Sequence, residues 1–284
     1  MSKKTRNRQL ARVHQRRVAE RRAQHRKRTI TIVVSLLVGL LGLGIVYVAF
    51  GRGGEETTPA ASGTPTPSAS ESPIGRPGTQ TGTVEPQPAV ETVACGAEVP
   101  KGATEPKPQF NAPAQVIQKS KTYRATLQTS CGDIVIELDA EAAPETVNSF
   151  VFLAEHGYFD GQYLTRIDTS IDVLQGGDPT GTGSGGPGYT IPDELTGKES
   201  YGPGVFAMAN AGPGTGGSQF FIITGDKGHL LDDQGAWTIF GNVVEGLDLA
   251  QEIQQIPVQD PSQGLAGQQP SQAVYFEKVT ISES

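Results

Sequence analysis

The chain has 284 residues and a formal net charge of −7, with 36 glycines, 20 prolines and two cysteines. Two cysteines exclude a small domain held together by many disulfides, and the glycine and proline content disfavours a helical bundle. The net charge hides an asymmetry: residues 1–28 contain 12 of the 23 Lys and Arg residues and one acidic residue, so they carry +11, whereas residues 29–284 carry 11 − 29 = −18. Such a sharp change of sign predicts a boundary next to the basic segment.

Residues 30–50 form an apolar run of 21 residues without a charged side chain. A helix of this length spans about 31 Å, close to the roughly 30 Å hydrocarbon core of a bilayer. We therefore expect a single transmembrane helix, with residues 1–29 in the cytoplasm by the positive-inside rule and everything after the helix outside it. A buried helix of a soluble domain and a cleaved signal peptide are the alternatives. Against them stand the absence of a polar stripe, the long basic leader and the lack of a small-residue cleavage site after Val48.

The basic segment 1–29 has a second interpretation, as an arm that binds nucleic acid. Attraction to anionic lipid headgroups and retention of the anchor explain its charge sufficiently. We therefore expect contact with membrane lipid through residues 30–50 and no nucleic-acid partner. The apolar run contains no G-x-x-x-G pair that would indicate helix dimerisation, and a monomer is expected.

Residues 51–117 are rich in Pro, Gly, Ser, Thr and Glu over most of their length, with almost no large apolar side chain. Such a composition cannot bury enough apolar surface to offset the entropy lost on ordering. We predict a disordered linker over 51–117 that spaces the following domain from the membrane. A glycosylated stalk is the alternative that this composition leaves open.

Cys95 and Cys131 both lie on the expected outer side of the membrane, where thiols oxidise. A disulfide between them would attach the end of the linker to the first hairpin of the folded domain. In the chain-entropy estimate, closing a loop of about 36 residues stabilises the folded state by roughly 3–4 kcal/mol. Two free buried thiols are the alternative to this predicted disulfide.

Residues 118–284 have the pattern of one compact domain. Alternating apolar residues on both sides of the turn at 130–133 predict a β-hairpin, and apolar residues at helical spacing between Pro144 and Gly157 predict a helix. A second helix is expected near 247–254, and further short strands at 163–167, 173–176, 204–208, 220–223, 238–244 and 274–281. Many short strands, glycine-rich turns and two helices indicate a mainly β fold, and a closed β-barrel rather than a parallel sheet.

Several common kinds of site are disfavoured in this domain. The glycines of GTGSGG (181–186) match a dinucleotide fingerprint in spacing, but prolines follow them instead of a helix. No serine sits in a nucleophile elbow, and His156 and His229 are the domain's two histidines. Two distant histidines and two cysteines do not make a ligand set, so neither a metal nor a cofactor is expected. What remains is Arg166 on a strand and an apolar, amide-rich segment at 205–222.

Residues 121–283 resemble the cyclophilin family of peptidyl-prolyl isomerases. The segment FAMANAGPGTGGSQFFI (206–222) nearly reproduces the family's most specific motif, and similar blocks occur in the family's order at 132–161, 166–183 and 240–248. The resemblance implies a closed eight-stranded β-barrel capped by two helices, with peptidyl-prolyl cis-trans isomerase activity.

This chemistry places unusual demands on a site. Rotation about an X–Pro bond has a barrier of roughly 18–20 kcal/mol, yet no bond is broken. The site must hold the proline ring in an apolar pocket and stabilise the twisted amide, for which a permanently protonated guanidinium is suited. The resemblance implies that Arg166 is the catalytic residue. It also implies two glutamines that support the arginine and the peptide, residues that grip the extended chain, and an apolar proline pocket: Gln175, Gln219, Ala209, Asn210, Val173, Phe221, Leu231 and Trp237.

Two segments depart from the family's pattern. In SIDVLQ (170–175), Asp172 falls where the family has a pocket phenylalanine and Val173 where it has a methionine. Because a carboxylate lines an apolar pocket only at a cost, Ile171 is the residue expected to turn inward instead. Trp237 stands where many members have a histidine. The pocket should stay apolar, with altered walls.

We therefore expect a membrane-anchored bacterial isomerase that acts outside the cytoplasm on proline-containing exported or cell-envelope polypeptides. Uncatalysed isomerisation takes tens to hundreds of seconds, which is slow enough to limit folding. The alternative is a catalytically weak or inactive module that binds proline peptides and is tethered to the membrane. A purely structural protein of the envelope is a third hypothesis.

Overall fold

The computed structural model of the chain describes residues 76–284. Three of the sequence predictions lie outside these residues: the basic segment 1–29, the transmembrane helix 30–50 and the first part of the linker. Within residues 76–284, no helix combines the length and the apolar character needed to cross a bilayer.

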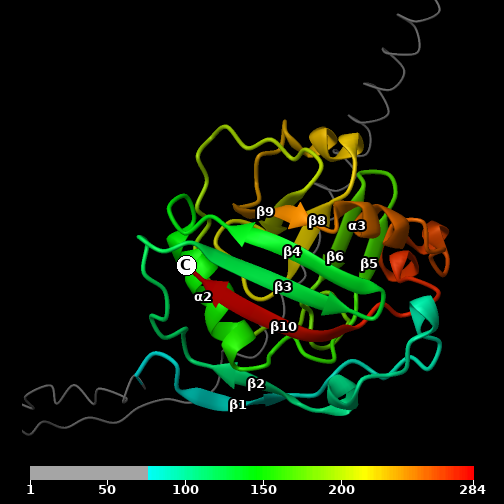
Figure 1. Cartoon of the computed structure of the whole chain (residues 1–284), viewed down its shortest axis with the longest axis horizontal. Coiled ribbons are helices and arrows are strands. Elements are labelled where there is room, and N and C mark those ends of the chain that lie inside the picture. The colour runs from blue at the N-terminus through cyan, green and yellow to red at the C-terminus, as the bar shows by residue number, and fades with distance from the viewer. Residues whose placement is uncertain (1–75) are drawn as a thin grey trace, which may run out of the picture. The chain divides into compact units, whose positions relative to one another are not determined.

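One antiparallel sheet of eight strands makes up most of the domain (Figure 1). Its strand order is β10-β3-β4-β9-β7-β8-β6-β5, which confirms the predicted mainly β fold. The eight strands are β3 (Tyr123–Thr129), β4 (Gly132–Leu138), β5 (Arg166–Asp168), β6 (Val173–Gly176), β7 (Val205–Met208), β8 (Phe220–Ile223), β9 (Ile239–Glu245) and β10 (Phe276–Glu283).

The period of two in the sequence explains the first hairpin. Every second residue of β3, beginning at Tyr123, is buried, and β4 alternates in the same way, so one face of the pair points into the core. Ala125 pairs with Ile136 across the two strands, and both are fully buried. A shift of one residue would expose this whole apolar set, which is why the register is strongly determined.

The sheet does not close into a barrel through a continuous ladder. β5 and β10 are its two edge strands. They are linked through the residues that precede them, by a bridge between Tyr163 and Tyr275 and by backbone hydrogen bonds such as Leu164 N to Val274 O at 2.9 Å. β5 has only three residues, so the regular pairing ends before the two edges can run side by side. The predicted closed barrel is therefore an open, curled sheet.

Both predicted helices are present, as α2 (Pro144–Glu155) and α3 (Leu247–Ile253). Pro144 occupies the first turn of α2, where its missing N–H is tolerated. Residues 76–284 also contain four 3-10 helices: η1 (Ala94–Gly96), η2 (Lys101–Thr104), η3 (Asp226–Leu231) and η4 (Pro261–Gln268).

Apolar residues of α2 pack against the inner face of the sheet. Phe150 lies at the centre of this contact. Its ring centroid is 5.0–5.7 Å from the centroids of four other phenylalanine rings: Phe159, Phe206, Phe220 and Phe240. Contacts of this kind add to the free energy of burial. A second, smaller apolar cluster lies around Val173, Tyr201 and Phe221. This second cluster supports the pocket described below.

Residues 76–117, called the strap from here on, pack against α2 and against the segment that precedes β10 (Figure 1). They contain the paired strands β1 (Gln80–Val84) and β2 (Lys107–Phe110). The side chain of Phe110 is buried against Phe152, with ring centroids 4.8 Å apart. The prediction of a disordered linker is therefore wrong for residues 76–117. The average composition of this proline-rich segment does not reveal the few apolar side chains, such as Phe110, that pack against the domain.

Covalent and polar contacts attach the strap at two further points. Cys95 and Cys131 form the disulfide that the sequence predicts. The buried amine of Lys107 donates hydrogen bonds to the carbonyl oxygens of Gly102, at 3.1 Å, and Asp160, and burial lowers its pKa. Gly161 has a φ of +76°, and a Cβ there would lie 2.2 Å from the Gly102 carbonyl carbon. Only glycine permits the strap to come this close to the domain.

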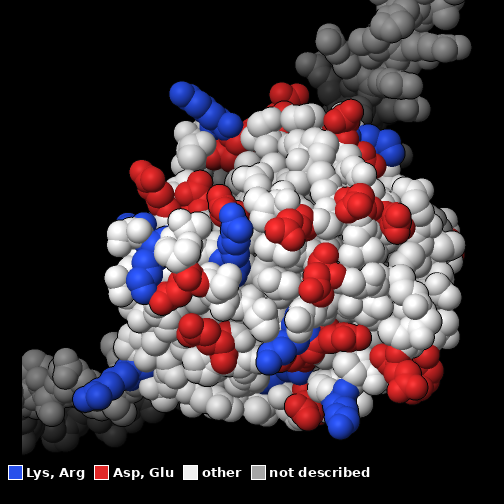
Figure 2. Space-filling model, viewed as in Figure 1, with Lys and Arg blue, Asp and Glu red and all other residues white. Residues whose placement is uncertain are grey.

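Acidic and basic side chains are interspersed on the face of the domain that carries β3, β4 and β10 (Figure 2). This face therefore lacks the single basic patch that is typical of a nucleic-acid-binding surface.

Candidate active site

A pocket of about 1200 Å³ is lined by residues of β5, β6 and β8 and by the loops beside them. The nine residues that the sequence assigns to catalysis and substrate binding all line this pocket: Arg166, Val173, Gln175, Ala209, Asn210, Gln219, Phe221, Leu231 and Trp237. They come from strands and loops that are up to 71 residues apart in the chain, from Arg166 to Trp237. The structure thus brings together every predicted site residue.

Strand register places three of these residues in one row. Arg166 of β5 is paired with Gln175 of β6, and Gln175 is in turn paired with Phe221 of β8. Because directly paired residues point to the same face of a sheet, their side chains share one surface of the pocket. The row runs from a cation through an amide to an apolar ring.

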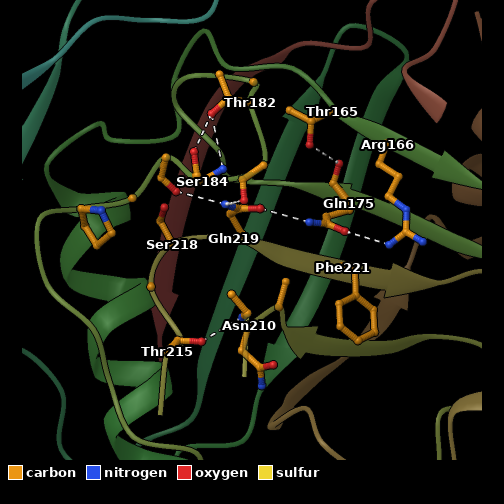
Figure 3. Close-up of a pocket in the computed structure, with 18 of the residues that line it drawn as sticks. Thr165, Arg166, Gln175, Thr182, Ser184, Asn210, Thr215, Ser218, Gln219 and Phe221 are labelled. Carbon is orange, nitrogen blue, oxygen red and sulfur yellow. Dashed lines mark hydrogen bonds between the residues drawn. The ribbon is translucent and has the colours of Figure 1, made fainter. Parts of the chain in front are cut away.

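Arg166, Gln175 and Gln219 form the polar wall of the pocket (Figure 3). Arg166 Nη1 donates to Gln175 Oε1 at 3.2 Å, and Gln175 Nε2 donates to Gln219 Oε1 at 3.1 Å. Gln219 Nε2 then donates to the carbonyl oxygens of Gly183 and Gly185 at 3.2 and 3.0 Å. Each amide accepts from one neighbour and donates to the next, so the orientation of each side chain depends on the others.

Arg166 has two more partners, which the sequence analysis did not predict. Its Nη2 donates to Asp168 Oδ2 at 2.5 Å, and its Nε donates to Gln268 Oε1 at 2.6 Å. A guanidinium has five N–H donors, and three of them are used in these contacts with Asp168, Gln268 and Gln175. Two donors remain for a substrate. The side chain is 22 % exposed, so it can be reached from the pocket.

The surroundings of Asp168 favour the ionised form of its carboxyl group beside the arginine. Burial of its carboxyl opposes ionisation, but hydrogen bonds from the backbone and hydroxyl of Ser170 and the ion pair with Arg166 outweigh that effect, and its pKa lies below the usual value. The Ser170 contacts are 2.9 and 2.6 Å long and both reach Oδ1. Oδ2 is therefore left to accept from the arginine.

Ile171, Val173, Phe221, Leu231 and Trp237 form the apolar wall of the pocket. Phe221 is buried, and its ring lies edge-on to the Trp237 ring at a centroid distance of 6.2 Å. No directed bond joins these five side chains to one another. The wall is therefore defined by packing, and its surface suits a proline ring.

Tyr201 is a fully buried residue behind the apolar wall that the sequence analysis missed. Its hydroxyl donates to the carbonyl oxygen of Trp237 at 2.8 Å and accepts from the Trp237 N–H at 3.1 Å. Burial raises the pKa of this hydroxyl, so it remains protonated. Tyr201 thus fixes the backbone of Trp237, and nothing in the surrounding ESYGPG segment indicates a contact 36 residues away.

The loop between β5 and β6 places Ile171 and Asp172 as the sequence predicts. Asp172 adopts a left-handed backbone with a φ of 51°. Its carboxylate accepts from the backbone N–H of Lys227 at 3.1 Å and from its Nζ at 3.2 Å, and it does not line the pocket. Ile171 lines the pocket in its place, so the wall stays apolar.

Asn210 and Ala209 stand at the edge of the pocket, and their polar groups are largely used within the protein. Asn210 Nδ2 donates to the carbonyl oxygen of Ala236 at 2.7 Å, and the Ala209 N–H donates to the carbonyl oxygen of Gln219 at 2.9 Å. Asn210 therefore joins the segment after β7 to the loop that carries Trp237.

The strap holds the glycine-rich loop 178–188, whose carbonyl oxygens end the polar wall. The Gln87 N–H donates to Pro179 O at 2.6 Å and the Phe110 N–H donates to Pro187 O at 2.7 Å. Gly188 has a φ of +92°, and a Cβ there would lie 2.8 Å from the Phe110 carbonyl oxygen. Residues of the predicted linker thus hold this loop near both of its ends.

Within residues 76–284, no group of three or more His, Cys, Asp or Glu side chains is arranged to hold a metal ion.

Comparison with known proteins places this geometry in a family. Residues 124–281 match the family described as cyclophilin type peptidyl-prolyl cis-trans isomerase/CLD. Peptidyl-prolyl cis-trans isomerase A of Mycobacterium tuberculosis is 39% identical over 177 residues, which are 57% of this chain and 93% of that protein. Peptidyl-prolyl cis-trans isomerase B of Bacillus subtilis is 46% identical over 121 residues, 42% of this chain and 82% of that protein.

Solved structures agree with the sequence comparison. A cyclophilin type peptidyl-prolyl cis-trans isomerase of Cryptosporidium parvum superimposes with a TM-score of 0.50 at 27% identity, covering 57% of this chain and 99% of that one. A second structure of the same protein, solved in the presence of the dipeptide Ala-Pro, matches equally well at 28% identity.

Proposed function

This chain belongs to the cyclophilin family of peptidyl-prolyl cis-trans isomerases, and we propose that it isomerises X–Pro bonds at the pocket beside Arg166. The observation that carries the proposal is the row across β5, β6 and β8, which sets a guanidinium, an amide and a phenyl ring on one surface. A peptide with its proline on the apolar wall would present its amide to the polar wall.

Catalysis is non-covalent in this proposal. The apolar wall holds the proline ring, and the two unused N–H donors of Arg166 stabilise the amide as it twists and loses conjugation. The guanidinium cannot lose its proton at any pH relevant to the protein, so it remains a donor throughout the reaction. One preorganised donor of this kind contributes roughly 100–1000-fold to a rate.

Proline-containing polypeptides outside the cytoplasm are the proposed substrates. The disulfide between Cys95 and Cys131 supports this location, because disulfides persist in oxidising compartments. The order of a basic segment, an apolar run of membrane-spanning length and then the disulfide-containing domain supports an anchor over residues 30–50. Fractionation followed by mass spectrometry tests the anchor: a soluble mature form that starts beyond residue 48 would exclude it.

A peptide-binding module without useful catalysis is the second candidate. The three protein contacts of Arg166 favour it, since they leave the guanidinium fewer donors for a substrate. The two candidates predict different effects of removing the guanidinium. The isomerisation rate should fall if the protein is an enzyme and should stay unchanged if it is a binding module.

The deciding experiment compares wild-type chain with Arg166→Ala in an exchange measurement by NMR on a proline peptide. Arg124→Ala is the matched control, because Arg124 also lies on a strand and pairs with a carboxylate, Glu137 at 3.0 Å, but is half exposed and does not line the pocket. We expect Arg166→Ala to lower the rate roughly 100–1000-fold and Arg124→Ala to leave it unchanged. Rates in all three proteins that are no faster than the uncatalysed rate, with peptide binding retained, would favour the binding module.

A further inference from the structure

We propose that Asp168 and Gln268 are positioning residues for Arg166, which hold its guanidinium in the orientation that leaves two N–H donors to the pocket. The inference rests on the catalytic role proposed for Arg166 and deepens it. In this inference, the guanidinium of Arg166 is already oriented before a substrate binds.

The first observation is that each nitrogen of the guanidinium has its own acceptor from a different element. Nη2 is bound by Asp168 of β5, Nη1 by Gln175 of β6 and Nε by Gln268 at the end of η4. A single hydrogen bond leaves a long side chain free to rotate about the bond, whereas three acceptors around a planar group determine both its position and its plane.

The second observation is that Asp168 is itself held in place. Its side chain is 7% exposed, and Oδ1 accepts both hydrogen bonds from Ser170. The contacts with Ser170 therefore determine the rotamer of Asp168 independently of Arg166. Oδ2 is the oxygen that faces the guanidinium. The carboxylate is a rigid support, and its hydrogen bond to the arginine belongs to the strong, charge-assisted class.

The third observation is that Gln268 lies in a loop whose two ends are bridged, 102 residues after Arg166 in the chain. The loop is joined at its base by the bridge between Val258 and Pro270, and within it the Asp260 N–H donates to the carbonyl oxygen of Gly267 at 3.0 Å. The neighbouring residue Gln269 lines the pocket and donates from Nε2 to Gly181 O at 3.4 Å. This loop therefore contacts the site at two adjacent positions.

These contacts have one consequence for the reaction. A neighbouring carboxylate reduces the net positive charge that a substrate meets, so Asp168 cannot assist by adding charge. Its benefit is geometric: an arginine that is already oriented loses little side-chain freedom when the transition state forms. If the carboxylate acted mainly by weakening the cation, its removal would raise the rate; if it positions the cation, its removal lowers the rate.

The test uses the full chain and four variants, with kcat and KM measured separately by NMR exchange on a proline peptide. Asp168→Asn leaves a single acceptor oxygen for Ser170 and Arg166 together, and Gln268→Ala removes the acceptor of Nε; we expect kcat to fall about 10-fold in each with KM changed less than about 2-fold. Gln268→Glu keeps an acceptor oxygen at the same reach but adds a second carboxylate, so its kcat should lie above that of Gln268→Ala. Asp172→Asn is the matched control: it neutralises the other paired carboxylate of the same hairpin, and asparagine tolerates the left-handed backbone there.

A second readout does not depend on activity. In the wild-type protein, the Nε–H of Arg166 should exchange slowly with water and give a sharp NMR signal, because Gln268 accepts it. Gln268→Ala should broaden this signal, and Gln263→Ala, which changes another glutamine of η4, should not. A rapidly exchanging Nε–H in the wild-type chain overturns the proposal, even where a variant fails to fold.

Failure of the inference is distinguishable from failure of the proposed function. If Arg166→Ala is inactive but Asp168→Asn and Gln268→Ala match the wild type, Arg166 is catalytic and needs no such positioning. An increase in kcat in Asp168→Asn would likewise overturn the positioning role. If Arg166→Ala keeps the full rate, Arg166 is not the catalytic residue, and the catalytic part of the proposed function is wrong.

Discussion

The two walls of the pocket are built in different ways. The polar wall is a chain of directed hydrogen bonds from Arg166 through Gln175 and Gln219 to the glycine-rich loop. The apolar wall consists of side chains that pack around Phe221 without directed bonds. A cation acts on a reacting amide only from the right position and angle, whereas a proline ring needs a dry surface of suitable volume.

This difference leads to different kinetic expectations for the two walls. A contact that is made only in the transition state contributes to kcat, while a contact made equally with the ground state contributes to KM. Changes in the polar wall should therefore lower kcat, and changes in the apolar wall should raise KM. The three predictions below test that separation.

Of these three predictions, the largest effect is expected for Phe221→Ala. The substitution removes most of a buried ring, so the unfolding free energy should fall by about 3–5 kcal/mol, and KM should rise at least about 10-fold as the surface for the proline ring is lost. Urea unfolding and NMR exchange at several peptide concentrations measure the two quantities. Phe221→Leu is the control, because it keeps much of the apolar volume and should lie between the alanine variant and the wild type. A fall in kcat with KM unchanged would contradict the separation.

The strap provides a test of how the polar wall is supported. Replacing Cys95 and Cys131 together by serine opens a loop of 36 residues and should lower the unfolding free energy by about 4 kcal/mol. Because the strap clamps the loop 178–188, the variant's kcat should fall more than its KM changes. Reductant should reproduce the effect in the wild-type protein and change nothing in the variant. Equal loss of stability with both kinetic constants unchanged would show that the strap supports the fold alone.

A smaller effect is expected for Gln219→Leu, which keeps the volume but interrupts the chain of amides. Gln175 Nε2 and two glycine carbonyl oxygens lose their partner, and kcat should fall about 5–10-fold with little change in KM. Gln219→Glu keeps the acceptor for Gln175 and loses the donation to the loop, so its kcat separates these two contributions. A rise in KM in either variant would place Gln219 in the binding surface instead.

Much of this site could be predicted from the sequence because its residues lie in short segments that resemble motifs of the cyclophilin family. Arg166 and Gln175 lie in one such segment and Phe221 in another, and the register of β5, β6 and β8 places the three in one row. The helices at 144–155 and 247–253 follow equally from local spacing. These features depend on residues that are close together in the sequence, so the sequence is sufficient to predict them.

Other features were decided only by tertiary structure. The strap has the composition of a disordered chain, and its order depends on a disulfide and a few buried anchors such as Phe110. The left-handed backbone at Asp172 turns one carboxylate away from the pocket, while Asp168, four residues earlier, binds Arg166.

Gln268 is the clearest case, since 102 residues separate it from the arginine that it contacts. Local spacing could predict the first hairpin and the helices, and the resemblance of short segments to a family's motifs could single out Arg166, because each is a property of a short segment. Which polar groups meet around that arginine could not be predicted in this way, because a hydrogen bond requires two atoms within about 3 Å, and only the folded chain sets distances between remote segments.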